Sequence, residues 1–416
     1  MRLIRKLYIK FIKNFSLIKI KYLFIIFLLS PFLIFIVLIK PIVLIRFGNL
    51  ACGRIGCFFN AELHLLFRKY NKKRVKSFDI WVTGNFISNE QYLIILKRKF
   101  LIIQYLFIFY KALELLSKYI NIYSEHIIEL GHIFKNYSLF YKNPIQLNLT
   151  KKEINKGELI LKQFGIPKNA KIVCISSRDD LYLKRTYPSV DFSYHNFRDS
   201  NVNNYIPAIK ALIQKNFYVV RMGKIAAKKL NIKSSKFIDY PFHPLKSDFM
   251  DFFFAYKCYF WIANNCGLDE LPRVFRKPLI LTNTAPFMSV QMQIKEYYYF
   301  PKIYINSKNQ KLSISKIFDY GIANINRSEE FKKKNIRLVE MTSKEYKGAI
   351  LESLKLMKDS WRIKNKKDLK LQRKFQKLYL KLYLKKAKEF NFVILHGKIK
   401  STYSPYFLRR NRWFLK

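Results

Sequence analysis

Acidic residues are scarce in this chain of 416 residues. Only 27 Asp and Glu stand against 78 Lys and Arg, which gives a formal net charge of +51. Such a charge favours partners that carry phosphate, namely nucleic acid, anionic lipid or a nucleotide-activated substrate. Lys, Asn, Ile, Phe and Tyr are all abundant, as AT-rich coding DNA also produces without selection for a ligand. The charge alone therefore does not identify the function.

The motifs of several common protein classes are also absent. The five cysteines form no CxxC pair and the six histidines no HExxH motif. We therefore expect neither a disulfide framework nor a metal site, and we expect the protein to reside in a reducing compartment. The sequence contains neither GxGxxG nor GxxxxGK[ST]. Assignment to the dinucleotide-dependent dehydrogenases or to the P-loop enzymes therefore loses its main support. The chain is 50% hydrophobic and 17% aromatic, which excludes intrinsic disorder.

The N-terminus combines positive charge with an apolar run. Residues 1–21 contain seven Lys or Arg and no acid, and the uncharged run 22–39 follows. Its eighteen residues are at the lower limit for crossing a membrane. Ser30-Pro31 interrupts the run, so a kinked span, a re-entrant hairpin, an interfacial helix and a buried core helix all stay open. We predict that residues 1–40 associate with the membrane.

Strand-like and helix-like segments alternate along the rest of the chain, which indicates parallel α/β sheets. The expected strands are 41–45, 80–82, 171–176, 217–222, 237–240, 259–263 and 278–282, and the expected helices are 56–70, 89–99, 150–165, 201–215, 225–230, 246–257 and 268–275. We expect a turn at 46–49. The sequence thus predicts two Rossmann-like domains, at 41–149 and 150–335, with a basic helical tail at 336–416.

Polar residues follow each expected strand of the second domain. Because the carboxyl ends of parallel strands share one edge of a sheet, these residues should lie near one another, where ligands bind in such folds. They are Arg178 after the first strand, Arg221 and Gly223 at the second, His243 after the third, Asn264, Asn265 and Gly267 after the fourth, and Asn283 after the fifth. We predict that they bind one ligand.

The turn 264–267 is the most specific part of this set. Gly267 opens a helix whose unpaired backbone N–H groups suit a phosphate or diphosphate. Glu270, one turn further on, is positioned to accept hydrogen bonds from a ribose. An ordinary helix cap would produce the same pattern, so that alternative stays open.

A second concentration of polar residues lies at 194–200, Tyr-His-Asn-Phe-Arg-Asp-Ser. Arg198 has the geometry to bind a phosphate with two hydrogen bonds. His195 suits acid or base chemistry near neutral pH. Asp199 is either a catalytic carboxylate or a cap of the following helix. In the first domain, Asn49, Arg54 and Gly56 occupy the equivalent strand-to-helix loop and are predicted to face the cleft.

The segments HNFRDSNVNNYIPAIKALIQKNFYVVRMGK and SDFMDFFFAYKCYFWIANNCGLDELPRVFRKPLILTN resemble a little-characterised family of bacterial glycosyltransferases from surface-polysaccharide gene clusters. The resemblance extends from about residue 42 to the segment YFLRRNRWF. It implies a GT-B fold, a nucleotide-sugar donor at the second domain, an acceptor at the first, and no bound metal or other cofactor. In the family Arg-Ile-Gly is usually followed by His, whereas Cys57 stands here.

The sequence therefore predicts a metal-independent glycosyltransferase at the cytoplasmic face of the bacterial inner membrane. Its partners would be a nucleotide-sugar donor, a glycan or lipid-linked acceptor and the membrane surface, with no nucleic acid. The alternative is a non-catalytic basic protein that binds membranes or nucleic acid. That alternative requires a continuous basic face with exposed aromatic residues beside it.

Overall fold

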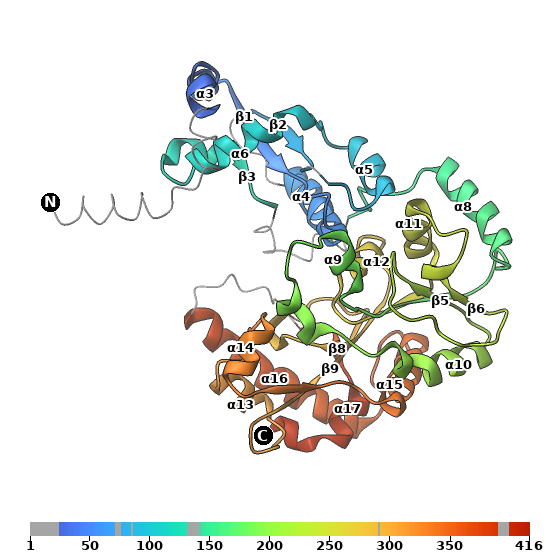
Figure 1. The fold of residues 1–416 in the computed structure, drawn as a ribbon. Coiled ribbons are helices and arrows are strands. Elements are labelled where there is room, and N and C mark those ends of the chain that lie inside the picture. The colour runs from blue at the N-terminus through green and yellow to red at the C-terminus, as the bar shows by residue number, and fades with distance from the viewer. Residues whose placement is uncertain are drawn as a thin grey trace. The chain divides into compact units, whose positions relative to one another are not determined.

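A computed structural model describes residues 25–70, 76–84, 86–130, 140, 143–289, 292–389 and 399–416. The chain divides into two compact units, Met1–Ile133 and Phe134–Lys416 (Figure 1). The sequence placed this boundary slightly later, at residues 142–150. Each unit contains its own parallel sheet, so the predicted α/β class with two Rossmann-like domains is confirmed.

The first unit is built on three parallel strands in the order β2-β1-β3. Its elements are α3 (Ser30–Leu38), β1 (Val43–Asn49), η1 (Ile55–Cys57), α4 (Phe58–Tyr70), β2 (Lys76–Val82), α5 (Glu90–Lys97), η2 (Gln104–Leu106), α6 (Phe107–Leu116), η3 (Asn121–His126) and β3 (Ile127–Ile128). The order 2-1-3 is that in which flavodoxin-like doubly wound sheets begin.

Strand β1 is longer than the sequence suggested, and the expected turn at 46–49 is wrong. Those four residues continue the strand and pair with β2 as far as Val82. Arg46 forms an ion pair with Asp79 of β2, with 2.8 Å between Nε and Oδ1. Gly48 is required here because a Cβ atom at this position would lie 2.4 Å from the Trp81 ring. The glycine therefore marks a close contact between strands.

The second unit contains a seven-stranded sheet in the order β12-β9-β8-β7-β4-β5-β6, with every neighbouring pair parallel. Its strands are β4 (Ile172–Ser176), β5 (Tyr218–Met222), β6 (Phe237–Asp239), β7 (Phe260–Ala263), β8 (Leu279–Thr284), β9 (Tyr297–Pro301) and β12 (Thr402–Tyr403). Apart from edge strand β12, this is the 3-2-1-4-5-6 order of nucleotide-binding doubly wound sheets. A separate antiparallel pair joins β10 (Ile303–Ile305) to β11 (Arg337–Val339).

Ten helices are described in this unit: α8 (Lys151–Gln163), α9 (Leu181–Thr186), α10 (Ile206–Gln214), α11 (Asp248–Lys257), α12 (Glu270–Val274), α13 (Ile314–Asp319), α14 (Ser328–Lys333), α15 (Ser343–Lys358), α16 (Lys366–Glu389) and α17 (Pro405–Arg410). Short 3-10 turns lie between them: η5 (Ser193–Arg198), η6 (Val202–Tyr205), η7 (Tyr240–Phe242), η8 (Gly267–Asp269), η9 (Phe287–Ser289) and η10 (Arg412–Leu415). Thr150 and Glu153 form a capping box at the start of α8.

The helix expected at 225–230 is wrong, since the backbone there is irregular. Its polar groups bind side chains instead. The Ala227 N–H donates to Asp179, the Lys228 carbonyl accepts from Arg221, and the Leu230 N–H donates to Asp239. These three bonds replace the hydrogen bonds that a helix would have made.

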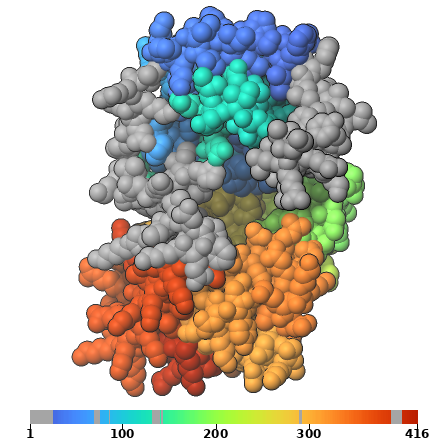
Figure 2. All heavy atoms as spheres, turned by 90° about the vertical axis from the view of Figure 1, so that its left-hand side faces the viewer, coloured from blue at the N-terminus to red at the C-terminus, as the bar shows by residue number. Residues whose placement is uncertain are grey.

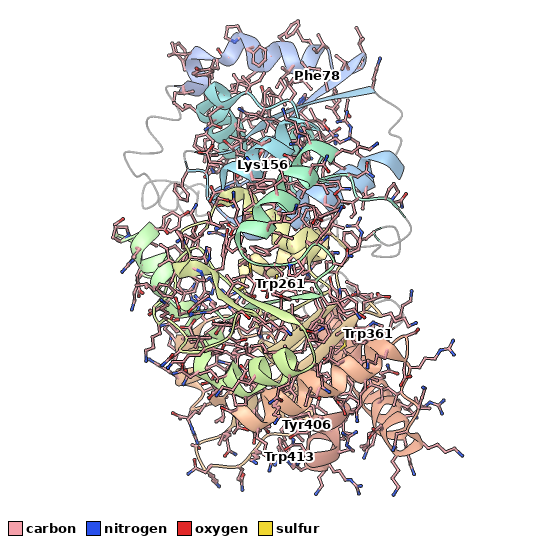
Figure 3. The ribbon with its side chains drawn as sticks, turned by 90° about the vertical axis from the view of Figure 1, so that its right-hand side faces the viewer. Phe78, Lys156, Trp261, Trp361, Tyr406 and Trp413 are labelled. Carbon is pink, nitrogen blue, oxygen red and sulfur yellow. The ribbon has the colours of Figure 1, made fainter. Side chains whose placement is uncertain are left out.

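The expected basic tail at 336–416 belongs to the second unit. Helix α15 packs against α10, α16 packs against α13 and α17, and β12 joins the edge of the sheet beside β9. Phe375 and Tyr379 of α16 are fully buried, so this Lys-rich helix turns an apolar face to the body of the unit. Tyr406 and Trp413, labelled in Figure 3, belong to the same C-terminal segment.

The apolar N-terminal run is described from residue 25 onward, and the basic residues before it lie outside the described part. Leu33 and Ile36 of α3 pack into the core of the first unit with Phe109 and Leu113. None of the described helices is both long and apolar enough to cross a membrane.

Candidate functional site

The direction in which successive strands are added to the second sheet reverses between β4 and β7. The chain passes from β4 outward to β5 and β6, and from β7 outward in the opposite direction to β8 and β9. Such a switch point leaves a crevice between the two adjoining loops, where doubly wound sheets bind their ligands. Arg178 follows β4 here, and Asn264 follows β7.

Asn264 joins the loops on both sides of this switch point. Its Oδ1 accepts from the backbone N–H of Arg178 at 2.9 Å, and its Nδ2 donates to the Arg198 carbonyl at 3.1 Å and to Ser200 Oγ at 2.8 Å. Asn264 is fully buried, so these bonds fix the positions of three segments. The sequence predicted Asn264 as a ligand, and the geometry gives it a positioning role.

Three cationic side chains gather beside Asn264, and we call Arg178, Arg198 and Lys302 the cation cluster. Arg178 Nη1 forms an ion pair with Asp199. Lys302, directly after β9, donates to the carbonyls of Phe197 and Asp199 at 2.9 and 2.6 Å. The predicted residues Arg178, Arg198 and Asp199 are therefore brought together as the sequence suggested.

The cluster is poorly hydrated and incompletely paired. Burial lowers the pKa of Arg178 to about 10, and Arg198 nearby lowers it as well. Burial also lowers the pKa of Arg198 and brings that of Lys302 to about 8. Arg178 Nη2 and Arg198 Nε are buried and have no hydrogen-bond partner among the described residues. Because buried cations are stable only when paired, an anion bound here would relieve this cost.

Lys302 is the residue of this site that the sequence analysis missed. It lies beyond the last strand that the analysis recognised. The signal was present, since Tyr297–Phe300 is a run of aromatic residues of the kind that favours strands, and Lys302 follows it after Pro301. Glu340 raises the pKa of Lys302, while Arg178 lowers it.

The turn after β7 is held in place by a buried carboxylate. Asp269 accepts from Ser176 Oγ at 2.8 Å and from the Cys266 N–H at 2.8 Å, and Trp261 of β7, labelled in Figure 3, donates to the same Ser176 oxygen. Asn265 has a φ of 59°, in the left-handed region. Gly267 begins η8, and α12 has only five residues. The short helix contributes a smaller dipole than the sequence suggested, so the cation cluster dominates the electrostatics.

Glu270 lies at the start of α12, as predicted. Burial raises its pKa to about 7, Arg273 lowers it, and Asp269 raises it. The Arg273 Nε lies 3.2 Å from Glu270 Oε2. A carboxyl group that is partly neutral at physiological pH both donates and accepts hydrogen bonds, which suits the hydroxyls of a ribose.

Three other residues that were predicted to bind the donor make contacts within the protein instead. Arg221 is buried and donates to Asp239 and to the Lys228 carbonyl. Asn283 donates to the Tyr346 hydroxyl and accepts from the Met341 N–H. Gly223 directly follows β5, and a Cβ atom at this position would lie 3.3 Å from Pro241. The structure therefore does not place Arg221 or Asn283 in the cation cluster.

The 194–200 block forms η5 and the loop after it. Ser328 at the start of α14 holds the block, since its hydroxyl donates to the Ser193 and Tyr194 carbonyls and accepts from the Phe197 N–H. The His195 ring stacks obliquely on Tyr194, with 4.0 Å between centroids. Asp199 does not cap a helix by its side chain, because Asn201 caps η6 and Asp199 pairs with Arg178.

The predicted acceptor residues lie in the first unit. Asn49 ends β1 and accepts the Ala51 N–H at 2.8 Å, Arg54 is exposed just before η1, and Gly56 lies within it. Asn49 thus shapes its own turn. No group of three or more His, Cys, Asp or Glu side chains in the described ranges is arranged to hold a metal ion.

No protein-family model matches this sequence, and no curated protein matches it. Among solved structures, E. coli ADP-heptose LPS heptosyltransferase II is 12% identical with a TM-score of 0.35, over 58% of this chain and 86% of its own. A family 9 glycosyl transferase from Veillonella parvula is 8% identical with a TM-score of 0.39, over 70% and 95%. A UDP-N-acetylglucosamine 2-epimerase is 13% identical with a TM-score of 0.32, over 77% and 98%.

Two of these proteins are named as glycosyltransferases and the third as an epimerase. At such TM-scores the likenesses are distant, and they carry no conclusion about the function of this chain.

Proposed function

We propose that this protein is a glycosyltransferase that moves a sugar from a nucleotide-sugar donor to a glycan or lipid-linked acceptor in surface polysaccharide biosynthesis. The observation that carries the proposal is the cation cluster at the switch point of the second sheet. A diphosphate is the anion that best matches three clustered cations, two of which have buried N–H groups without an acceptor among the described residues.

In this reaction an acceptor hydroxyl attacks the anomeric carbon of the donor sugar. The bond from that carbon to the diphosphate oxygen breaks, and the nucleoside diphosphate leaves with the electron pair. Negative charge grows on the leaving oxygen, where Arg178, Arg198 and Lys302 would stabilise it. Glu270 would hold the ribose of the donor.

The hydroxyl proton must pass to a base. His195 is the candidate within the second unit, because imidazole accepts protons near neutral pH. Asp199 is less suited to this role than the sequence suggested, since its carboxylate is held by Arg178. We assign Asp199 to orienting Arg178. Asn49, Arg54 and Gly56 are proposed to meet the acceptor, and the enzyme to work at the cytoplasmic face of the inner membrane.

The proposal is tested by ligand binding to the full chain. Thermal unfolding is followed with uridine, guanosine, cytidine, thymidine and adenosine diphospho-sugars, and the stabilising donor is then titrated by calorimetry. We expect one nucleotide class to raise the Tm, and the Arg178→Gln variant to lose that shift. Arg337→Gln, which removes an equal charge from an exposed position of strand β11, is the matched control and should keep it.

Two results would overturn the proposal. One is that no nucleotide sugar changes the Tm of the full chain. The other is that single-stranded nucleic acid binds with higher affinity than any donor, and that Arg178→Gln and Arg337→Gln weaken this binding equally. That second result would support the non-catalytic alternative.

A further inference from the structure

Helix α3 is apolar on every side. No polar side chain occurs between Pro31 and Ile39. Leu33 and Ile36 point into the core of the first unit. A helix on the surface of a water-soluble domain normally turns polar residues outward, whereas a helix that is apolar all round is covered on all sides. The outer side of α3 therefore lacks the polar residues that water would favour.

The exposed fractions show how large this outer side is. Phe27 is 74% exposed, Leu38 70% and Ile42 80%. Ile42 lies in the turn after the helix, and the remaining exposed apolar residues are Leu28, Phe32, Ile34 and Phe35. At 100° per residue, the exposed positions from 27 to 38 cover one continuous arc, with Leu33 and Ile36 opposite. We call these seven residues the α3 face.

Helix α6 extends the apolar surface. It packs beside α3, with 5.3 Å between the ring centroids of Phe32 and Phe109, and Figure 2 shows the two helices next to each other. Ile108 of α6 is exposed, and exposed tyrosines lie just before and just after the helix, at Tyr105 and Tyr119. Tyrosine is enriched where membrane proteins meet the headgroup layer, because its ring is apolar and its hydroxyl is polar.

Charge decides between the possible occupants of the α3 face. A second copy of the chain would carry the same net charge of +51 and would be repelled. An anionic bilayer would be attracted by the same charge. The seven cations of residues 1–21 directly precede the α3 segment in the sequence, as in amphipathic membrane anchors that combine apolar burial with basic residues.

We propose that the α3 face, together with the exposed residues of α6, inserts into the headgroup region of an anionic phospholipid bilayer, so that the first unit lies on the membrane without crossing it. The nine residues of α3 span roughly 14 Å at 1.5 Å per residue, about half of the hydrocarbon thickness. This inference rests on no step of the sugar transfer, and it concerns a different unit from the cation cluster.

The first test measures binding of the full chain to vesicles of 70% phosphatidylcholine and 30% phosphatidylglycerol. The variant Leu28→Gln/Phe35→Gln/Leu38→Gln removes apolar area from the α3 face without adding charge. We expect its partition constant to fall at least about tenfold. The matched control is Leu159→Gln/Val190→Gln/Tyr320→Gln, which alters three exposed apolar residues of the second unit and should bind like the wild type. Equal thermal unfolding of the three proteins shows that folding is unchanged.

The second test places a probe in the α3 face. With Phe35→Trp, the difference emission spectrum against the wild type should shift to the blue on vesicles and be quenched by brominated lipid. A spectrum that does not change on vesicles, or an unaltered partition constant for the triple variant, overturns the proposal. Dimerisation of the wild type without lipid that the triple variant abolishes also overturns it, and assigns the face to a second copy. Donor binding is unaffected by any of these outcomes.

Discussion

Two arginines of the second unit lie at the carboxyl ends of neighbouring parallel strands and differ in how well the protein pairs them. Arg221, near the end of β5, is paired with Asp239 of β6 and with the Lys228 carbonyl. Arg178, just beyond β4, is paired with the carboxylate of Asp199, and Arg198 and Lys302 are the other cations in its neighbourhood. Both arginines are buried, so burial does not separate them.

The difference lies in whether the protein supplies enough acceptors. At β5 the guanidinium group of Arg221 is paired within the protein. Its partners are Asp239 and the Lys228 carbonyl, which lies in the irregular loop after the strand. At β4 the donors Arg178 Nη2 and Arg198 Nε find none among the described residues. A basic residue at the end of a strand is therefore a candidate for binding a ligand only where the protein does not supply enough hydrogen-bond acceptors for it.

The largest effect should come from Arg221. Replacing it with Met leaves Asp239 buried without its cation, which costs about 3–5 kcal/mol of folding free energy. We expect a lower denaturation midpoint by urea unfolding and, in the fraction that remains folded, unchanged affinity for the nucleotide sugar.

The matched control for this change is Arg221→Met/Asp239→Asn. The Asn side chain keeps an acceptor for the Leu230 N–H but carries no charge, so it should recover part of the lost stability. A large loss of donor affinity in the single variant would instead return Arg221 to the ligand site, where the sequence analysis had placed it.

The sequence was sufficient to predict most of the second sheet. Five of its strands were predicted within one or two residues, because each is a short apolar run bounded by turn residues or by a helix start. The turn at 46–49 was wrong because Gly48 indicates a turn in sequence, whereas here it makes room for Trp81. The helix at 225–230 was wrong because side chains from the loop after β4 and from β5 and β6 bind its backbone, and most of these contacts are not local in sequence.

The site was predicted less completely for a related reason. Position after a strand selected Arg178 and Asn264, which lie together at the switch point, but it selected Arg221 equally, since the Asp239 partner can be assigned only once β5 and β6 are known to be neighbours. Lys302 was missed because its strand was not recognised. Pairing between distant segments thus decides which of the predicted polar residues are available to a ligand.

The next effect concerns Arg198. Arg198→Gln should lower the affinity for the nucleotide sugar by about 30-fold, close to 2 kcal/mol, because it removes charge-assisted hydrogen bonds to a diphosphate. Stability should stay the same or rise slightly, since Arg198 lowers the pKa of Arg178 through repulsion. Calorimetric titration beside Arg337→Gln measures the first effect and thermal unfolding the second. Equal affinities in the two variants would show that Arg198 does not contact the donor.

The smallest effect is a pH dependence that distinguishes Lys302 from the arginines. Burial lowers its pKa from 10.5 to about 8, so the side chain loses its proton over a range in which a diphosphate keeps its full charge. Affinity for the donor should fall by about tenfold between pH 7 and pH 9.5, and the fall should be absent in Lys302→Gln, which keeps a donor for the loop carbonyls.

The folding equilibrium should respond to Lys302 in the opposite sense. Because the unfolded chain holds this proton up to its ordinary pKa of 10.5, it binds more protons than the folded chain between pH 8 and pH 10.5, and the wild type should gain stability relative to Lys302→Gln as the pH rises through that window. Over this pH range, the affinity for the donor should fall while the folding stability rises. A paired cation such as Arg221 does not produce this combination. Affinity that stays level from pH 7 to pH 9.5 in both proteins would exclude Lys302 from the donor site and leave it as a support for the 197–199 loop.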